Sequence, residues 1–243
     1  FLKRRKPDPD FDFCLRMHAV SFARECARVL RAGFVLLDKE HGCARVVKKT
    51  TDAVYTFDFS DFRGRTLEED LLHRDFTVNA LALPLDEALD SGRPLRSVVD
   101  PHAGLADLRA GIIRMAHPGT FDEDPVRIMR AFSFAALLAF RIDPRTLRVL
   151  AAKRRQVRLV AAERLRDEFF RLLSSGQAAF WVREMDRRGV ADLLLPEIKP
   201  MKKARRSGKN GFNVWEHSLG TLEHLERILG RSERDPAVRA YCS

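Results

Sequence analysis

Residues 73–83 read HRDFTVNALAL, a charged pair followed by an amphipathic run. If this run is helical, Asp75 and Asn79 share one face, and Arg74 lies about 100° further round with a side chain long enough to reach back. A guanidinium suits phosphate oxygens, a carboxylate can hold a ribose hydroxyl, and an amide can do either. The stretch therefore indicates a nucleotide site, although an ordinary helix carrying an Arg-Asp ion pair and a capping Asn fits it too.

Upstream, Asp10–Leu15 reads DFDFCL, and charged and apolar residues alternate over its first four positions. This period of two places Asp10 and Asp12 on one face of a strand, with Phe11 and Phe13 facing the core. Two neighbouring carboxylates repel each other unless a cation lies between them, and hard oxygen ligands suit Mg2+ at a phosphoryl-transfer site. An edge strand with solvated acids explains the same pattern.

The segments between these two motifs change from a helical to an extended period. We expect one helix and three strands, over residues 18–31, 34–37, 44–47 and 53–59. Asp58, near the end of the last strand, could complete a carboxylate trio or be an ordinary strand-end acid. Thr66 opens a further helix, because Glu69 follows it at the spacing of a capping box.

Beyond residue 117, apolar residues recur at the spacing of a helix to the end of the chain. We expect helices over residues 121–140, 143–153, 161–174, 177–188 and 214–230. Pro125 is tolerated only in the first turn of the first of these. The sequence predicts an α+β fold, with a small mixed-sheet head over 1–117, a helical neck over 118–175 and a helical body over 176–243.

The net charge of +10 is unevenly distributed. Residues 141–210 contain 19 Lys or Arg against 8 Asp or Glu, and the rest of the chain is nearly neutral. Such an excess suits a polyanion, and nucleic acid is the obvious one, although a solvated helix face can look the same. The candidate RNA-binding residues are Lys153, Arg154, Arg155, Lys202, Lys203, Arg205 and Arg206.

The sequence also bears on whether the protein crosses a membrane and on the redox state of its compartment. The longest nearly uninterrupted apolar run, residues 131–140, is about half of the roughly 20 residues that a membrane-spanning helix needs, so we expect no membrane partner. Four cysteines, Cys14, Cys26, Cys43 and Cys242, show no C-x-x-C spacing, which is typical of the reducing cytoplasm. Because the first residue is Phe1, we expect an interior fragment or the ordered part of a longer chain.

Taken in order, these motifs resemble the class II tRNA nucleotidyltransferase and bacterial poly(A) polymerase family, whose members add CCA, A or poly(A) to RNA. The blocks that carry the resemblance are DFDFCL (10–15), DFSDFRG (58–64), LEEDLLHRDFTVNALAL (67–83), DPHAGLADLRAGIIR (100–114), FDEDPVRIMRAFSFAA (121–136) and ERLRDEFFRLL (163–173). The resemblance implies a nucleotidyltransferase head followed by an all-helical neck and body.

The resemblance also implies roles for individual residues. Asp10 and Asp12 are expected to bind metal and, with Asp58, to form the catalytic carboxylates. Nucleotide binding is expected of Arg74, Asp75, Asn79, Asp124, Arg127 and Arg130. Glu163, Arg164 and Glu168 are expected in a structural helix behind the site.

These roles predict template-independent addition of nucleotides to an RNA 3′ end, with a tRNA acceptor arm favoured and ATP and possibly CTP as donors. Asp10 and Asp12 would hold two Mg2+ ions, and pyrophosphate would leave. Asp124 and Arg127, three residues apart in the first turn of a long helix, would project together and read the amino edge of adenine or cytosine. A helix-capping Asp paired with an Arg is the alternative.

Several departures from the family pattern keep other functions open. A Gly-rich phosphate loop is expected just upstream of Phe1, His73 replaces the usual first Arg of its motif, and Ser133 stands where an Arg is common. A catalytically inactive RNA-binding paralogue is therefore the alternative. Residues 212–225, FNVWEHSLGTLEHL, resemble the start of an HD-like region in which His217 would be the first metal ligand, but they do not by themselves support a phosphohydrolase.

Overall fold

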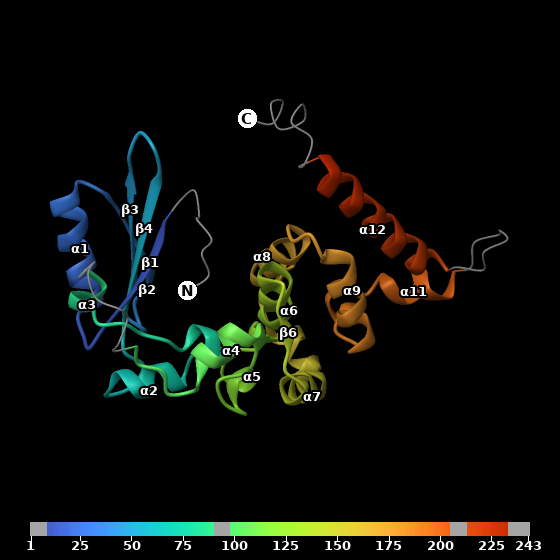
Figure 1. Cartoon of the computed structure of the whole chain (residues 1–243), viewed down its shortest axis with the longest axis horizontal. Coiled ribbons are helices and arrows are strands. Elements are labelled where there is room, and N and C mark those ends of the chain that lie inside the picture. The colour runs from blue at the N-terminus through green and yellow to red at the C-terminus, as the bar shows by residue number, and fades with distance from the viewer. Residues whose placement is uncertain (1–8, 90–97, 205–212, 233–243) are drawn as a thin grey trace. The chain divides into compact units, whose positions relative to one another are not determined.

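The computed structural model describes residues 9–89, 98–204 and 213–232 (Figure 1). It divides into two compact units at the junction of His73 and Arg74. This junction precedes the predicted domain boundary near residue 117, which stays a prediction. Within the described residues, no helix has both the length and the apolar character needed to cross a lipid bilayer.

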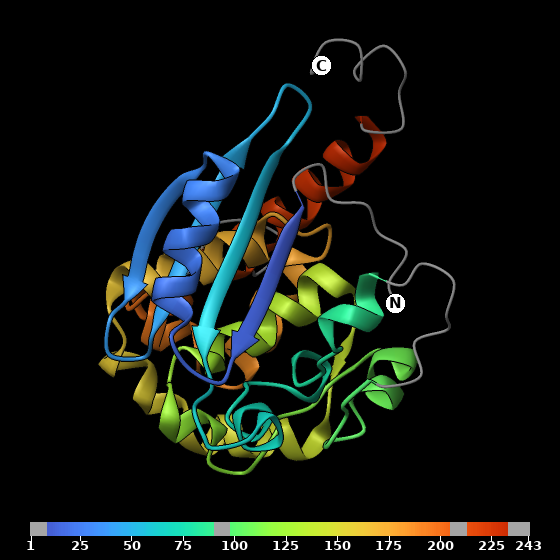
Figure 2. The same cartoon turned by 90° about the vertical axis from the view of Figure 1, so that its left-hand side faces the viewer.

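The first unit is a four-stranded mixed sheet with a helix on one face (Figures 1 and 2). Its elements are β1 (Asp10–Leu15), α1 (Ala19–Leu30), β2 (Gly33–Asp38), β3 (Cys43–Lys49), β4 (Val54–Asp61) and α2 (Leu67–Leu72). The strand order is β1-β4-β3-β2, with β1 parallel to β4 and the other neighbours antiparallel. The predicted strands and helices of this region are thereby confirmed, including the side-chain cap of α2 by Thr66, which accepts from the backbone N of Glu69.

Helix α1 packs on the sheet through small residues. Ala19 and Ala23 are fully buried, and they contact a core that includes Val46. Phe13 packs against the same core as predicted, whereas Phe11 remains 44% exposed, so its prediction as a core residue is wrong. The reason is topological: β1 is an edge strand, and the principal contacts of α1 are with β2, β3 and β4.

The turn before β3 and the start of α1 share one carboxylate. Asp61, the last residue of β4, accepts a hydrogen bond from the backbone N of Ala19 at 2.8 Å. A Cβ atom at Gly42, where φ is +61°, would lie 2.1 Å from Asp61 Oδ2. Glycine is therefore required at the end of this turn, both for its left-handed backbone and for the space that the carboxylate fills.

The second unit is mostly helical, which confirms the predicted α+β class. Its elements are η1 (Thr77–Asn79), α3 (Leu85–Leu89), α4 (Gly104–Ala110), β5 (Ile112–Ile113), α5 (Thr120–Glu123), α6 (Arg127–Leu138), β6 (Arg141–Ile142), α7 (Pro144–Lys153), η2 (Arg154–Leu159), α8 (Ala162–Leu173), α9 (Ala178–Arg187), α10 (Ala191–Leu194), α11 (Ile198–Lys203) and α12 (Val214–Ser232). Helix α6 is central to the core, because Ile128, Met129, Phe132 and Ala135 are fully buried and the helix contacts α8 and α9. Strands β5 and β6 form a short parallel pair.

The predicted helix over residues 73–83 is wrong. Only Thr77–Asn79 forms a helical turn, and it is a single 3-10 turn. Phe76 is extended and forms an antiparallel bridge with Met115, 39 residues further along the chain. Backbone hydrogen bonds to a distant segment therefore replace those that a helix would have supplied locally.

The predicted single helix over residues 121–140 is also wrong. Helix α5 ends at Glu123, and α6 begins at Arg127. Asp124 between them is extended, with φ −150° and ψ 102°. Pro125 explains the break, because proline lacks a backbone N–H and disfavours helical backbone at the residue before it.

Helix α4 approaches η1 closely and is tied to the start of α7 by ion pairs. A Cβ atom at Gly104 would lie 2.0 Å from the carbonyl oxygen of Thr77, so only glycine allows this approach. Asp107 accepts from Thr77 Oγ1 and from Arg114 Nε, each at 2.8 Å. Arg114 also donates to Asp143 at 2.8 Å. This network fixes η1, and with it the residues that flank the turn.

Candidate active site

In the first unit, Asp10 and Asp12 lie on one face of β1, as the alternation predicts. Asp12 is the register partner of Asp58 on β4, and Asp58 is the partner of Arg45 on β3. Because register partners project to the same side of a sheet, these three side chains form a row across three strands. Phe13 projects to the other side and packs with α1, so the row lies on the face opposite that helix.

Arg45 and Asp58 form a two-pronged ion pair. Nε and an Nη atom of Arg45 each donate to one carboxylate oxygen of Asp58, both at 2.7 Å. Hydrogen bonding to Asp58 raises the pKa of the guanidinium against the lowering effect of burial, and the charges of Asp10 and Asp12 add to the rise. Sequence reasoning missed Arg45; the signal that could have found it is a lone cation within the otherwise apolar run 43–47.

The carboxylates on this face suit a hard divalent cation. Asp10 and Asp12 are exposed and offer oxygen donors, and Mg2+ is usually held by one or two carboxylates while keeping several waters. Within the described ranges, no three or more His, Cys, Asp or Glu side chains come together as a possible metal site. The structure therefore does not assemble the carboxylate trio that the sequence left open, since Asp58 is bound to Arg45.

In the second unit, Asp75 organises the residues of the HRDFTVN motif. It is only 6% exposed, and its Oδ1 accepts from the backbone N of Phe76 at 2.8 Å and from Asn79 Nδ2 at 3.2 Å. The sequence thus correctly brings Asp75 and Asn79 together, although a tight turn and not a helix does so. Arg74 is the partly exposed residue beside Asp75.

The second oxygen of Asp75 faces Arg130 of α6. Arg130 Nε lies 3.0 Å from Asp75 Oδ2, but the two atoms are not aligned as a hydrogen bond. The guanidinium also lies over the ring of Phe134, 5.0 Å from its centroid. Two residues that the sequence assigned separately to nucleotide binding are therefore joined directly, across 55 positions of the chain.

Asp124 lies in the break between α5 and α6. Its Oδ1 accepts from the backbone N of Val126 at 3.3 Å, but Val126 is the N-cap of α6 and no side chain caps that helix. Both of its oxygens also accept from Arg164 of α8, at 3.2 and 2.7 Å.

Arg127, by contrast, is the first residue of α6 and is only 5% exposed. It donates to the carbonyl oxygen of Thr120 at 3.2 Å and to Glu123 at 3.1 Å. The prediction that Asp124 and Arg127 leave the first turn of one helix is wrong, because Pro125 separates them.

Ser133 lies on the side of α6 that packs against α8. It is fully buried, and its hydroxyl donates to Glu168 of α8. Glu168 also pairs with Arg171 at 3.4 Å. A serine here therefore links α6 to α8.

The candidate RNA-binding residues differ in how much of their charge is available. Lys153 pairs with Asp122, and Lys202 pairs with Asp186 and Asp192. Arg154 is partly buried and donates to the carbonyl oxygen of Ala151 at 2.6 Å. Arg155 and Lys203 are exposed, and Arg205 and Arg206 lie outside the described residues.

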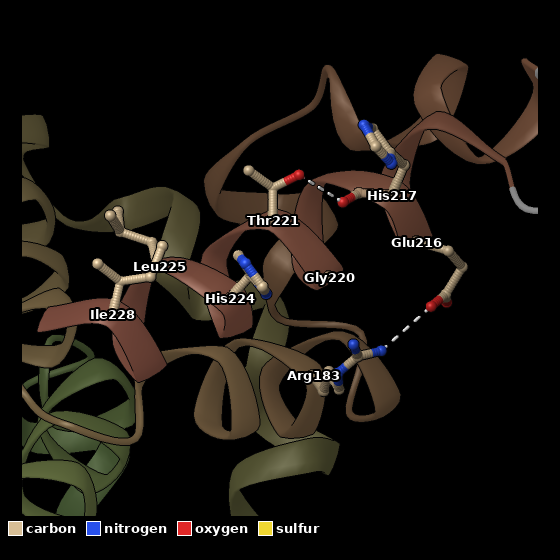
Figure 3. Close-up of a pocket in the computed structure, with 8 residues that line it drawn as sticks. All are labelled: Arg183, Glu216, His217, Gly220, Thr221, His224, Leu225 and Ile228. Carbon is tan, nitrogen blue, oxygen red and sulfur yellow. Dashed lines mark hydrogen bonds and ion pairs between the residues drawn. The ribbon is translucent and has the colours of Figure 1, made fainter. Parts of the chain in front are cut away.

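A groove of about 670 Å3 lies between α9 and α12 (Figure 3). Arg183 of α9 donates a hydrogen bond to Glu216 of α12 at 3.1 Å. Within α12, Thr221 Oγ1 donates to the carbonyl oxygen of His217 at 3.0 Å. His217 and His224 line the groove, but no metal-binding group that includes them occurs among the residues that the structure describes. None of the residues that line the groove is among the residues proposed above to bind nucleotide or Mg2+.

The sequence matches two known protein families. Residues 1–114 match the poly A polymerase head domain, and residues 139–202 match the probable RNA and SrmB-binding site of polymerase A.

Curated relatives carry tRNA nucleotidyltransferase names. The CC-adding tRNA nucleotidyltransferase of Synechocystis sp. is 39% identical over 181 residues, 74% of this chain and 41% of the relative. The A-adding tRNA nucleotidyltransferase of Deinococcus radiodurans is 35% identical over 222 residues, 89% of this chain and 48% of the relative. The chain thus spans less than half the length of these two relatives.

Solved structures agree in fold. A tRNA nucleotidyltransferase complexed with a primer tRNA and an incoming ATP analog is 27% identical, with a TM-score of 0.64, over 80% of this chain and 55% of that one. The Thermotoga maritima CCA-adding enzyme complexed with tRNA is 29% identical, with a TM-score of 0.65, over 79% of this chain and 45% of that one. Together, the matched head and RNA-binding regions, the relatives and the shared fold show that the chain belongs to the tRNA nucleotidyltransferase and poly(A) polymerase family.

Proposed function

We propose that this chain is a template-independent RNA nucleotidyltransferase that adds CCA, A or poly(A) to RNA 3′ ends, with a tRNA acceptor arm as the favoured substrate. The observation that carries the proposal is the exposed pair of Asp10 and Asp12 on one sheet face, within a region that matches a polymerase head domain. The relatives named for CC addition and A addition to tRNA support the substrate class.

The proposed chemistry is phosphoryl transfer with pyrophosphate as the leaving group. Asp10 and Asp12 would hold two Mg2+ ions, which would stabilise charge at the triphosphate and lower the pKa of the attacking 3′-hydroxyl. Asp58, which the sequence assigned to the same catalytic group, lies in the same row on the sheet but does not hold the metal in this proposal, because the fork of Arg45 fixes its orientation.

Four residues of the second unit hold the ribose and triphosphate in this proposal: Arg74, Asp75, Asn79 and Arg130. The guanidinium groups suit phosphate oxygens, and the Asn79 amide suits a ribose hydroxyl. Asp75 is held in place by three partners, so its role is to position Asn79 and Arg130.

Asp124 and Arg127 select the base. A carboxylate accepts from the exocyclic amine of adenine or cytosine, and a guanidinium donates to the ring nitrogen beside that amine. Uracil and guanine present a carbonyl oxygen to the carboxylate instead. This complementarity supports ATP and CTP as the nucleotide donors.

The wider organisation follows from the same proposal. Residues 1–117 form the nucleotidyltransferase head, 118–175 the neck and 176–243 a basic body that binds RNA through phosphate contacts. A cytoplasmic location is part of the proposal, since the cysteines of the sequence show no C-x-x-C spacing.

The decisive test uses three primers: tRNA that lacks CCA, tRNA that lacks only the terminal A, and oligo(A). Each is incubated with labelled ATP or CTP and with wild-type protein, Asp10→Ala, Asp12→Ala or the control Asp52→Ala, which changes an exposed acid in a turn of the first unit. Asp10→Ala and Asp12→Ala should lose incorporation, and Asp52→Ala should keep it. Folded Asp10→Ala and Asp12→Ala proteins with wild-type incorporation would refute the assignment, whereas wild-type protein that binds tRNA but incorporates nothing would favour the inactive paralogue.

A further inference from the structure

Arg45 places a fixed positive charge among the carboxylates of the first unit. It lies on the same sheet face as Asp12 and Asp58, in the same row across β1, β4 and β3. Its side chain is 42% exposed, and that of Asp58 is 26% exposed. The ion pair is therefore open to the solvent from which a metal ion would arrive.

We propose that Arg45 is a positioning residue that keeps Asp58 out of the metal-ligand set, so that divalent cations bind to two carboxylates, Asp10 and Asp12, and not to three. This inference rests on the proposed function, in which those two aspartates hold the metal.

The geometry of the ion pair supports the proposal that Asp58 binds Arg45 while Asp10 and Asp12 bind the metal. The guanidinium donates to both oxygens of Asp58 at 2.7 Å, so each oxygen of that carboxylate is already engaged with a cation. A metal ion that recruited Asp58 would have to displace a charged two-pronged contact, which is among the stronger side-chain hydrogen-bonding arrangements.

Without Arg45, the same backbone would favour a third ligand. Neighbouring strands are separated by about 4.8 Å, and Mg2+ binds carboxylate oxygens at about 2.1 Å, so register partners such as Asp12 and Asp58 can reach one ion between them. The absence of a three-ligand group within the described part of the chain agrees with Asp58 being turned to Arg45.

Two carboxylates also suit the proposed reaction better than three. Mg2+ needs six ligands, and each position not taken by the protein remains available to water, triphosphate oxygen or the primer hydroxyl. Arg45 thus keeps the site open and its resting affinity for divalent cations low.

The test measures Mn2+ binding to the chain by electron paramagnetic resonance, without nucleotide or RNA, because Mn2+ shares the oxygen-ligand preference of Mg2+. The variants are Arg45→Met, Asp58→Asn and their double mutant. Lys49→Met serves as the matched control, because it removes one positive charge on the same strand, about 13 Å along β3 from Arg45.

We expect Arg45→Met to bind Mn2+ about tenfold more tightly than wild type or better, because it both removes a nearby cation and frees a carboxylate. Lys49→Met should stay within about twofold of wild type. Adding Asp58→Asn to Arg45→Met should remove most of the gain, and Asp58→Asn alone should give no gain. Unchanged or weaker binding in folded Arg45→Met, or a gain that survives in the double mutant, would overturn the inference.

Asp12→Asn separates this inference from the proposed function. If wild-type Mn2+ binding is unaffected by Asp12→Asn, the proposed metal site is wrong whatever Arg45 does. If Asp12→Asn abolishes binding while Arg45→Met changes nothing, the metal site stands and only the role of Arg45 fails.

Discussion

Arg164 of α8 holds both carboxylate oxygens of Asp124, at 3.2 and 2.7 Å, across 40 positions of the sequence. Asp124 lies where Pro125 interrupts the helical backbone, so no continuous helix fixes its direction. The guanidinium of Arg164 and the backbone N of Val126 fix it instead. Helix α8, for which the sequence predicts a structural role, therefore orients Asp124, for which the sequence predicts base selection.

Asp124→Ala should erode discrimination against UTP and GTP by about one to two orders of magnitude, because an unpaired polar group on the base costs about 1–3 kcal/mol. Arg164→Ala should give a smaller loss in the same direction, since the carboxylate remains but its orientation is freed. Single-nucleotide incorporation with each of the four triphosphates measures both effects.

Arg166→Ala is the control for this pair, since Arg166 lies on the same helix and pairs with the exposed Asp167. It should keep the wild-type preference. Full preference for ATP or CTP in both Asp124→Ala and Arg127→Ala would show that bases are selected elsewhere in the protein.

Gly104→Ala should destabilise the second unit by roughly 3 kcal/mol, at the upper end for an overpacked position, because the new Cβ would meet the carbonyl oxygen of Thr77 at 2.0 Å. Gly220→Ala provides the contrast, because it lies within α12 with nothing within 4 Å of the added atom. That change should be neutral or raise the free energy of unfolding by up to about 1 kcal/mol. Urea denaturation followed by circular dichroism compares them, and equal midpoints for Gly104→Ala and wild type would contradict the close packing of α4 on η1.

Arg114→Leu should lower the free energy of unfolding by about 1–2 kcal/mol, a value already reduced for the solvent exposure of the guanidinium. The change leaves Asp107 and Asp143 without the cation that bridges them. Arg109→Leu on the exposed side of α4 should change the unfolding midpoint little. A pair of variants with the same midpoint would show that the bridge does not stabilise the fold.

RNA affinity should depend on the exposed basic residues more than on the paired ones. Arg155→Ala and Lys203→Ala should each reduce the slope of log K against log salt by about one, whereas Lys202→Ala should leave it nearly unchanged, because Asp186 and Asp192 already neutralise that lysine. Fluorescence anisotropy of labelled tRNA between about 50 and 200 mM KCl measures the slopes. A flat dependence in the wild type would exclude binding dominated by phosphate contacts.

The sequence by itself determined the features that depend on local periodicity. Alternation at Asp10–Leu15 set Asp10 and Asp12 on one face of a strand, and the spacing of Thr66 and Glu69 identified a capped helix. Four later helices, α7, α8, α9 and α12, also follow their predicted ranges closely. Such features are readable because each depends on residues within one or two turns of the chain.

Only the tertiary structure decided which distant groups meet. The partners of Asp58, Asp75 and Asp124 proved to be Arg45, Arg130 and Arg164, each from another strand or helix. No periodicity predicts such pairs, because they depend on strand register and helix packing, which are set by the burial of the whole core. For the same reason, the run 73–83 has a helical pattern but lies beside the segment at Met115: burying Phe76 against that segment outweighs a weak local preference.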